Sequence, residues 1–143
     1  MDVLSIASIA IVTPEPAESR KLFMGALGLP LKRHDGGDYY FSENIGGSKH
    51  FGVWPLSQAA EACFGTTVWP AHRPIPHACF EFEVADKESV AAAAEELKSK
   101  GYVLLHGART EPWGQTVARM QTAEGVIIGI SYAPWMHEAA PVG

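Results

Sequence analysis

One helix pattern occurs twice in this sequence, and the repeat limits the fold more than any other feature. Thr13 and Asp86 are residue types that cap helix N-termini, and each is followed fifteen residues later by a glycine, Gly28 or Gly101, of the kind that ends a helix. Between cap and glycine, apolar residues recur at helical spacing both times. The two copies lie 73 residues apart, so the chain contains an internal duplication of a module of about 70 residues.

Strand patterns surround both expected helices in the same order. An apolar strand precedes each helix, and three short strand candidates follow it, separated by glycine turns or a loop. Each half reads as βαβββ, which predicts an α+β fold class: two tandem βαβββ modules forming concave mixed sheets. The predicted boundaries are a single domain at 1–143, a first module at 3–55, a linker at 56–76, a second module at 77–132 and a C-terminal tail at 133–143.

Several local features are expected within this plan. The first helix is expected to start at Thr13 and to bury a face made of Leu22, Phe23, Ala26 and Leu27. The linker is expected to cross the surface between modules, and its AAEACF piece to form a short helical turn. The segment at 107–114 reads as a loop, and the tail as a frayed end.

Charge and composition exclude several classes of partner. The net charge of −5, with scattered Lys and Arg, argues against nucleic acid, because phosphate binding needs a basic face. No run of about 18 apolar residues is present that would cross a membrane. The acidic N-terminus does not resemble a signal peptide, and two cysteines do not make a disulfide framework, so the sequence predicts a cytoplasmic protein with free thiols.

The paired βαβββ modules resemble the vicinal oxygen chelate superfamily, which includes glyoxalases, bleomycin-resistance proteins and extradiol dioxygenases. Two stretches carry the resemblance: IAIVTPEPAESRKLFMGALGLPL in the first half, and FEVADKESVAAAAEELKSKG followed by EPWGQTVARMQTAEGVIIGISY in the second. The resemblance covers residues 6–132. It implies the fold and does not name a reaction, because this fold hosts lyases, epimerases, dioxygenases and binding proteins without chemistry.

In metal-dependent relatives of this kind, four ligands come from the first and last strands of each module. The resemblance would place them at Ser8, Gly52, Cys79 and Gly129, of which only the cysteine is a usual ligand. Residues 3–12 contain no His, Glu, Gln, Asp or Cys, and VIIGISY contains none either. Two interpretations of Gly129 remain open: a bulge or close packing, and room for a ligand in the cavity.

Other chemistry-bearing residues gather on the second module's first strand. Alternation places His77, Cys79, Glu81 and Glu83 on one face, which His50 could join. One hypothesis is a rearranged metal site of His50, His77, Cys79 and Glu81. Another is a Cys79 thiolate activated by His77. The third, which we favour, is the wetter face of a half-buried sheet with a small buried thiol.

All four tryptophans are adjacent to a proline, which places them at strand ends and in loops. Such a rim can stack on a flat or cationic molecule, or anchor loops and an interface through apolar burial. Trp54 and Trp113 are the stronger candidates for ligand contact. Arg119 is expected to pair with a surface acid, with an anionic group in the cavity as the alternative.

Two functions remain after this reading. The favoured one is a metal-free protein that binds a small aromatic or cationic molecule in a concave cavity, by sequestration or resistance, with no cofactor and no catalytic residue. The alternative is a metal-dependent lyase or dioxygenase with atypical ligands. The expected ligand-binding residues are His50, Trp54, His77, Cys79, Glu81, Trp113 and Gln115, and the resemblance implies a homodimer.

Overall fold

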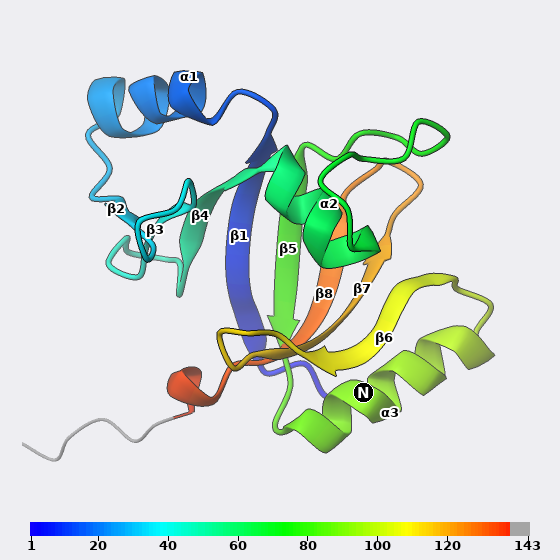
Figure 1. The fold of residues 1–143 in the computed structure, drawn as a ribbon. Coiled ribbons are helices and arrows are strands. Elements are labelled where there is room, and N and C mark those ends of the chain that lie inside the picture. The colour runs from blue at the N-terminus through cyan, green and yellow to red at the C-terminus, as the bar shows by residue number, and fades with distance from the viewer. Residues whose placement is uncertain (138–143) are drawn as a thin grey trace, which may run out of the picture.

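The structure is a computed structural model that describes residues 1–137, and one continuous mixed sheet dominates it (Figure 1). Within those residues the eight strands follow the order β2-β3-β4-β1-β5-β8-β7-β6. The strands are β1 (Ser5–Thr13), β2 (Lys32–Arg33), β3 (Tyr40–Ser42), β4 (Phe51–Pro55), β5 (Ala78–Glu83), β6 (Leu104–Thr110), β7 (Thr116–Gln121) and β8 (Ile127–Tyr132). The helices are α1 (Pro16–Arg20), which continues as a π-helical segment (Lys21–Ala26), α2 (Leu56–Phe64), α3 (Lys87–Ser99) and a 3-10 helix (Pro134–Met136).

The sheet joins the two halves through their first strands. β1 pairs with β5 in antiparallel fashion, while β1 with β4 and β5 with β8 are parallel pairs, one in each half. The same element order, βαβββ, appears on both sides of this junction. The predicted α+β fold of two tandem modules is therefore confirmed.

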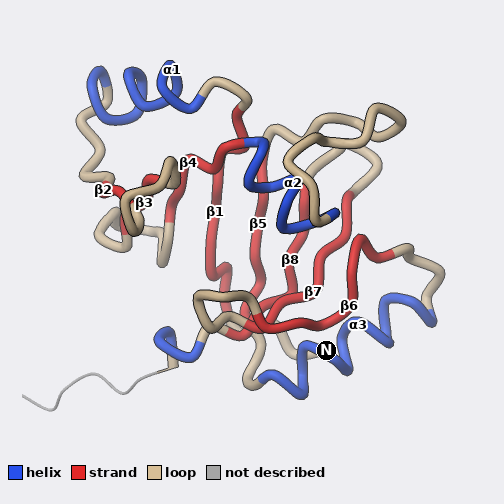
Figure 2. The backbone as a smooth tube through the Cα atoms, viewed as in Figure 1, coloured by secondary structure: helices blue, strands red, loops and turns tan. Residues whose placement is uncertain are grey.

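The two sheet faces are covered by different helices. On one face, α3 packs Val90 and Ala93 against Val84, which directly follows β5, and Ile130 of β8. On the other, which we call the cavity face, α2 packs on Ala10, Cys79 and Ile127. In Figure 2, α2 crosses in front of the long central strands, whereas α3 runs beside β6. Strand alternation separates these two sets of side chains, as the period of two requires.

The linker prediction was wrong for its first half. Residues 56–64 form the two-turn helix α2, and they bury Ala59, Ala60 and Cys63 instead of crossing the surface. Trp69, which follows the helix, is also buried in this cluster, and its Nε1 donates to the carbonyl oxygen of Pro74 at 2.9 Å. Small side chains on one helical face explain the fit, since they let the helix backbone approach the sheet closely.

The two module helices differ in how they begin and pack. Asp86 caps α3 as predicted, accepting a hydrogen bond from the Ser89 backbone N–H at 2.7 Å. The first helix begins at Pro16 instead, and Thr13 lies in the preceding strand, where its Oγ1 accepts from the backbone N–H of Glu15 at 3.0 Å. The N-cap prediction at Thr13 was therefore wrong by two residues, because proline fixes φ in the first helical turn.

The first helix also lacks the buried face that its periodicity predicts. Neither α1 nor the π-helical segment contains a buried residue, and Leu22 and Leu27 are 50% and 57% exposed. The segment contacts the sheet through Phe23, whose ring lies edge-on to Phe51. Figure 1 shows α1 at the margin of the molecule, beyond the short strands β2 and β3, which offer little sheet surface to cover.

Two further boundaries differ from expectation. The sequence predicts a loop at 107–114, but β6 continues to Thr110. The strand extends that far because Thr110 pairs with Thr116, the first residue of β7. The segment predicted as a frayed tail contains the 3-10 helix at Pro134–Met136. Residues 138–143 of that tail lie outside the described residues. Within residues 1–137, no helix has the length and apolar character that a membrane crossing needs.

Candidate ligand-binding site

A cavity of about 510 Å³ opens on the cavity face and takes its lining from both halves of the sheet. Ser8 and Ala10 of β1 contribute small side chains to it, while Gln58 of α2 and Met136 of the 3-10 helix contribute from outside the sheet. The volume lies within the range of roughly 300–1,000 Å³ that is typical of small-molecule sites. The position at the junction of the two halves makes it the candidate functional site.

Six of the seven residues expected from the sequence line this cavity. They are His50, Trp54, Cys79, Glu81, Trp113 and Gln115. The seventh, His77, is exposed just before β5 and is not part of the lining. Alternation placed it on the correct face, but the strand starts after it, so its side chain is beyond the cavity.

Tryptophans form much of the rim. Trp54, Trp113 and Trp135 line the cavity, and Trp113 and Trp135 are 45% and 40% exposed. The Trp113 indole is oriented by Gln115, whose Oε1 accepts from its Nε1 at 2.9 Å, and Gln115 Nε2 in turn donates to Ser131 Oγ at 2.8 Å. Of the four tryptophans expected at the rim, Trp69 belongs to the core instead.

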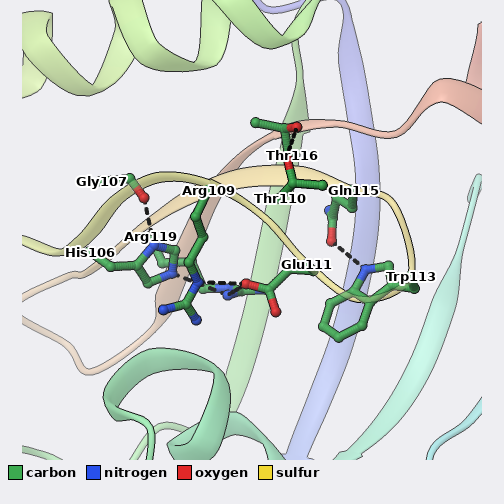
Figure 3. A network of polar contacts seen from close by, with 9 residues as sticks. All are labelled: His106, Gly107, Arg109, Thr110, Glu111, Trp113, Gln115, Thr116 and Arg119. Carbon is green, nitrogen blue, oxygen red and sulfur yellow. Dashed lines mark hydrogen bonds and ion pairs between the residues drawn. The ribbon is translucent and has the colours of Figure 1, made fainter.

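Arg119 lies at the back of the cavity, and the expected surface ion pair was wrong. Its side chain is 1% exposed, and Nη1 lies 3.3 Å from Oε1 of Glu111, which is itself buried and also bound by Arg109 at 2.7 Å (Figure 3). The guanidinium also lies 5.7 Å from the centre of the Trp54 ring. Arg119 is thus buried beneath the cavity and pairs within the protein instead of at the surface.

His106 completes this network as a neutral imidazole. Its Nε2 accepts from Arg119 Nη1 at 3.1 Å, and its Nδ1 donates to the Gly107 carbonyl oxygen at 2.7 Å (Figure 3). Burial, with a smaller contribution from the Arg119 charge, lowers the pKa of His106 to about 4. The carboxylate of Glu111 is thus shared by Arg119 and Arg109, and His106 adds no positive charge at neutral pH.

Glu81 projects into the cavity, and Gly129 makes room for it. The two residues face each other across the β5–β8 pairing, and a Cβ placed on Gly129 would lie 3.1 Å from Glu81 Cγ and 3.3 Å from Val117 Cγ2. The strand pairing is regular at Gly129, so close packing, not a bulge, explains the glycine. Burial raises the pKa of the Glu81 carboxyl, and Arg119 and Gln115 offset part of this rise.

Cys79 is a buried thiol on the cavity wall. Burial, together with the neighbouring Glu81, raises its pKa well above the ordinary value. A thiolate nucleophile needs the opposite environment, with a cation or a helix N-terminus nearby. The exposed His77 does not supply that base, so the arrangement supports the thiol as part of the wall.

A group that the sequence reasoning missed stands on the opposite wall. The hydroxyl of Tyr39 bonds to Nε2 of His50, and the other ring nitrogen of His50 lies 3.6 Å from Oε1 of Glu43. The phenol lies directly over Gly52, where any Cβ would overlap its oxygen. The signal that could have found it was Gly52 within KHFGVWP, since a glycine inside a strand often marks close approach of another group.

The four positions at which metal-dependent relatives hold their ion do not form a donor set here. Ser8, Glu81 and Gly129 share one row across the sheet, whereas Gly52 and Cys79 lie in the adjacent row. Apart from the hydroxyl of Ser8, which is not a usual metal ligand, only the carboxyl of Glu81 and the protonated thiol of Cys79 carry donor atoms in these rows.

His50 does not complete such a set. Both of its ring nitrogens are directed at protein groups, the Tyr39 hydroxyl and the Glu43 carboxylate. Among residues 1–137 no three His, Cys, Asp or Glu side chains converge as metal ligands require. The described residues therefore do not fit the divalent ion of the metal-dependent alternative, and no step is assigned to one.

Comparison with known proteins places the chain by sequence. The family model described as glyoxalase/bleomycin resistance protein/dioxygenase superfamily matches residues 5–130. A search of curated proteins gave no match.

Solved structures show a similar fold at low identity. A glyoxalase/bleomycin resistance protein/dioxygenase superfamily member from Vibrio splendidus 12B01 is 14% identical, with a TM-score of 0.55 over 87% of this chain and 95% of that one. A Streptomyces coelicolor methylmalonyl-CoA epimerase is 15% identical, with a TM-score of 0.57 over 93% and 96%. A Mn(II)-bound glyoxalase from Novosphingobium aromaticivorans is 16% identical, with a TM-score of 0.58 over 90% of this chain and 38% of that one. At these identities the likeness concerns the fold alone.

Proposed function

This chain belongs to the glyoxalase/bleomycin resistance protein/dioxygenase superfamily, and on that premise we propose that it binds a small aromatic molecule, neutral or cationic, in its cavity without a metal ion. Its function is then to hold or sequester that molecule. The observation that carries the proposal is the partly buried carboxyl of Glu81 inside a cavity rimmed by Trp54, Trp113 and Trp135. Aromatic rims of this kind hold flat ligands through stacking and, for cations, through attraction to the ring faces.

The charges around the cavity support a ligand that is not an anion. Arg119 forms its ion pair with Glu111, which Arg109 shares. The carboxyls of Glu81 and Glu43 form no ion pair with an arginine or lysine among the described residues, although Glu81 feels the charge of Arg119. A hydrogen-bond donor or a positive group on the ligand would meet Glu81 and favour its charged form. An anionic group in the same place would be repelled and would also lose its hydration.

Binding of three matched compounds tests this proposal: phenethylamine, 1-phenylpropan-2-one and phenylacetate, which are cationic, neutral and anionic. We expect saturable quenching of tryptophan fluorescence by the first two and at least tenfold weaker binding of phenylacetate. Replacing Trp54 and Trp113 by phenylalanine should remove most of the quenching signal. Trp69, which is buried in the core, serves as the internal emitter that the ligands leave unchanged. Absence of saturable binding for all three compounds would overturn the proposal.

A matched pair of glutamate variants tests the part assigned to Glu81. Glu81→Gln keeps the shape of the side chain and removes its charge, so the preference for phenethylamine over phenylacetate should shrink towards unity. Glu88→Gln, on the exposed first turn of α3, removes the same charge away from the cavity and should leave the preference intact. Equal effects of the two variants would show that net charge, not Glu81, sets the preference.

We also propose that the protein is a cytoplasmic homodimer. Exposed apolar side chains occur in two places, Leu4 and Ile6 near the N-terminus and Leu22 and Leu27 around the first helix, and each is at least half exposed. Such surface is costly to leave in water, at roughly 25 cal/mol per Å². Both cysteines are free and buried, which suits a reducing compartment. Sedimentation velocity across a hundredfold range of concentration measures the assembly directly, and a constant monomer mass would contradict it.

A further inference from the structure

Three side chains on the first-half wall of the cavity form a chain that ends in a hydroxyl group. Tyr39 bonds through its oxygen to Nε2 of His50, and the other nitrogen of His50 faces Glu43. The rings of Tyr39, Phe41 and His50 are nearly parallel, with 10° between Tyr39 and Phe41 and 8° between Phe41 and His50. This stack fixes the plane of the phenol, and Gly52 lets it lie flat against β4.

The opposite wall presents a carboxyl to the same space. Ser8 of β1 pairs with Glu81 of β5 on one side, and on the other side β1 is bonded to His50 through the backbone N–H of Ile9. The small side chains of Ser8 and Ala10 therefore lie between the two walls. Because neighbouring strands are about 4.8 Å apart, the backbones of β4 and β5 are separated by roughly 10 Å, enough for one small planar molecule.

The protonation states of the two walls are complementary. Burial and then the nearby Glu81 raise the pKa of Tyr39, so its hydroxyl keeps its proton at neutral pH. Burial lowers the pKa of His50, so the imidazole is neutral, and in the tautomer with its proton on Nε2 it donates to the Tyr39 oxygen and leaves the phenol proton free for a ligand. The pKa of Glu81 is raised by burial, which makes its carboxylate a stronger base than an exposed one. One wall can give a proton while the other takes one.

We propose that this cavity catalyses keto–enol isomerisation of a small aryl carbonyl compound, with Glu81 as the base and Tyr39 as the acid, and with no metal ion. The inference rests on the proposed function, since the same cavity must first bind the molecule. His50 and Glu43 are positioning residues in this scheme, because they orient and support the Tyr39 hydroxyl without touching the substrate.

The step conserves atoms and electrons. Glu81 takes a proton from the carbon next to the carbonyl group, and the C–H electron pair becomes the new C=C bond. The π electrons of the carbonyl move to its oxygen, which takes the proton of Tyr39. Glu81 then releases its proton to solvent, and the Tyr39 phenolate regains one from solvent by way of His50. One proton has moved from carbon to oxygen, and no oxidant or reductant is needed.

Deuterium exchange at the benzylic carbon of 1-phenylpropan-2-one in D₂O measures this step, because enolisation exchanges that carbon's hydrogens. We expect the wild-type protein to exchange them well above the buffer rate, with the rate followed by proton NMR and unchanged by EDTA. Tyr39→Phe and Glu81→Gln should each slow exchange by about 100-fold or more, the usual contribution of a general acid or base. Tyr102→Phe and Glu88→Gln, at exposed sites, are the matched controls and should match the wild type.

Further readouts separate chemistry from folding and binding. Tryptophan quenching by the same ketone should give dissociation constants within about threefold for the wild type and Tyr39→Phe, and Glu81→Asp should recover part of the exchange lost in Glu81→Gln. For the positioning role of His50, His50→Gln should slow exchange and move the alkaline limb of its pH profile, which reports Tyr39.

The outcomes distinguish the two proposals. Saturable binding of the ketone with exchange at the buffer rate would overturn the isomerase inference and leave the binding function standing. Exchange that persists in both Tyr39→Phe and Glu81→Gln, or that EDTA abolishes, would also overturn the inference. Failure of all three aromatic compounds to bind would overturn both proposals.

Discussion

A methyl group added at Gly129 would press on the side chain that the candidate site depends on most. We expect Gly129→Ala to lower the free energy of unfolding by about 1–3 kcal/mol, because the new Cβ would lie 3.1 Å from Glu81 Cγ in a closely packed strand pair. Displacement of Glu81 should also weaken ketone binding. Chemical denaturation measures the first effect and fluorescence quenching the second.

The matched control is another strand glycine with open space around it. A Cβ at Gly107, on β6, would meet nothing within 4 Å, so Gly107→Ala should change stability by less than about 0.5 kcal/mol. Equal stability of the two alanine variants would show that Glu81 can move away from the added Cβ at position 129 without loss of unfolding free energy. The carboxylate of Glu81 would then not depend on a glycine across the strand pair.

Glu81 also predicts a pH dependence with a definite sign. Its pKa is raised above the ordinary glutamate value of 4.5, so the folded protein holds this proton more tightly than the unfolded chain does. The stability that Glu81 contributes is therefore complete below about pH 4.5 and is lost as pH rises through its folded-state pKa. Glu81→Gln does not titrate, so the unfolding free energy of the variant minus that of the wild type should grow between pH 4.5 and 8.

Urea denaturation of both proteins at matched pH values gives this difference directly. Groups such as His106 titrate in both proteins and cancel in the subtraction. A difference that stays constant with pH, or that shrinks as pH rises, would mean that the Glu81 carboxylate is stabilised in the folded state. Its part as a base in the cavity would then lose its physical support.

At the scale of elements, the C-terminal 3-10 helix forms one edge of the site and is tied to β5. Glu83 Oε2 accepts from the backbone N–H of Ala133 at 2.6 Å and lies 2.9 Å from Nε2 of His137. Trp135 and Met136, between these two contacts, line the cavity. We expect His137→Ala to weaken ketone binding several-fold and to lower the free energy of unfolding by about 1 kcal/mol, the net value of one hydrogen bond.

His72→Ala is the control for this variant, because His72 is exposed on the loop after α2. It should leave both binding and stability unchanged. Binding by His137→Ala at the wild-type affinity would show that the 3-10 helix keeps its place without the Glu83–His137 contact. Quenching titrations and urea denaturation of the two variants provide the comparison.

The sequence predicted elements best where a local pattern was sufficient. The capping side chain of Asp86 and the alternation that puts Cys79 and Glu81 on one face are local features, and the structure contains both. The burial of α2 and of Arg119 was missed, because each depends on which sheet face becomes covered. Tyr39 was missed for a similar reason, since its partner His50 is eleven residues away across a turn.

At the scale of the whole molecule, the two halves repeat one topology but are unequal in packing. The second half has α3 on a face built from β6, β7 and β8, whereas in the first half β2 and β3 have two and three residues and α1 buries none. Segments with few buried contacts open at low free energy. We therefore expect residues 16–33 to exchange their backbone amide hydrogens far faster than β5, β7 and β8, as measured by mass spectrometry of peptides.

The same experiment tests whether a second copy completes the first half. If exposed Leu22 and Leu27 lie in the proposed dimer contact, amide exchange in residues 16–33 should slow as protein concentration rises through the dimerisation range, while α3 stays unchanged. Leu22→Glu should remove that concentration dependence and leave ketone binding intact, because Leu22 is not part of the cavity lining. Slow amide exchange in residues 16–33 at all concentrations would show instead that the first half is stable without a partner. Fast exchange there in a protein that sedimentation shows to be a dimer would mean that the dimer contact lies elsewhere.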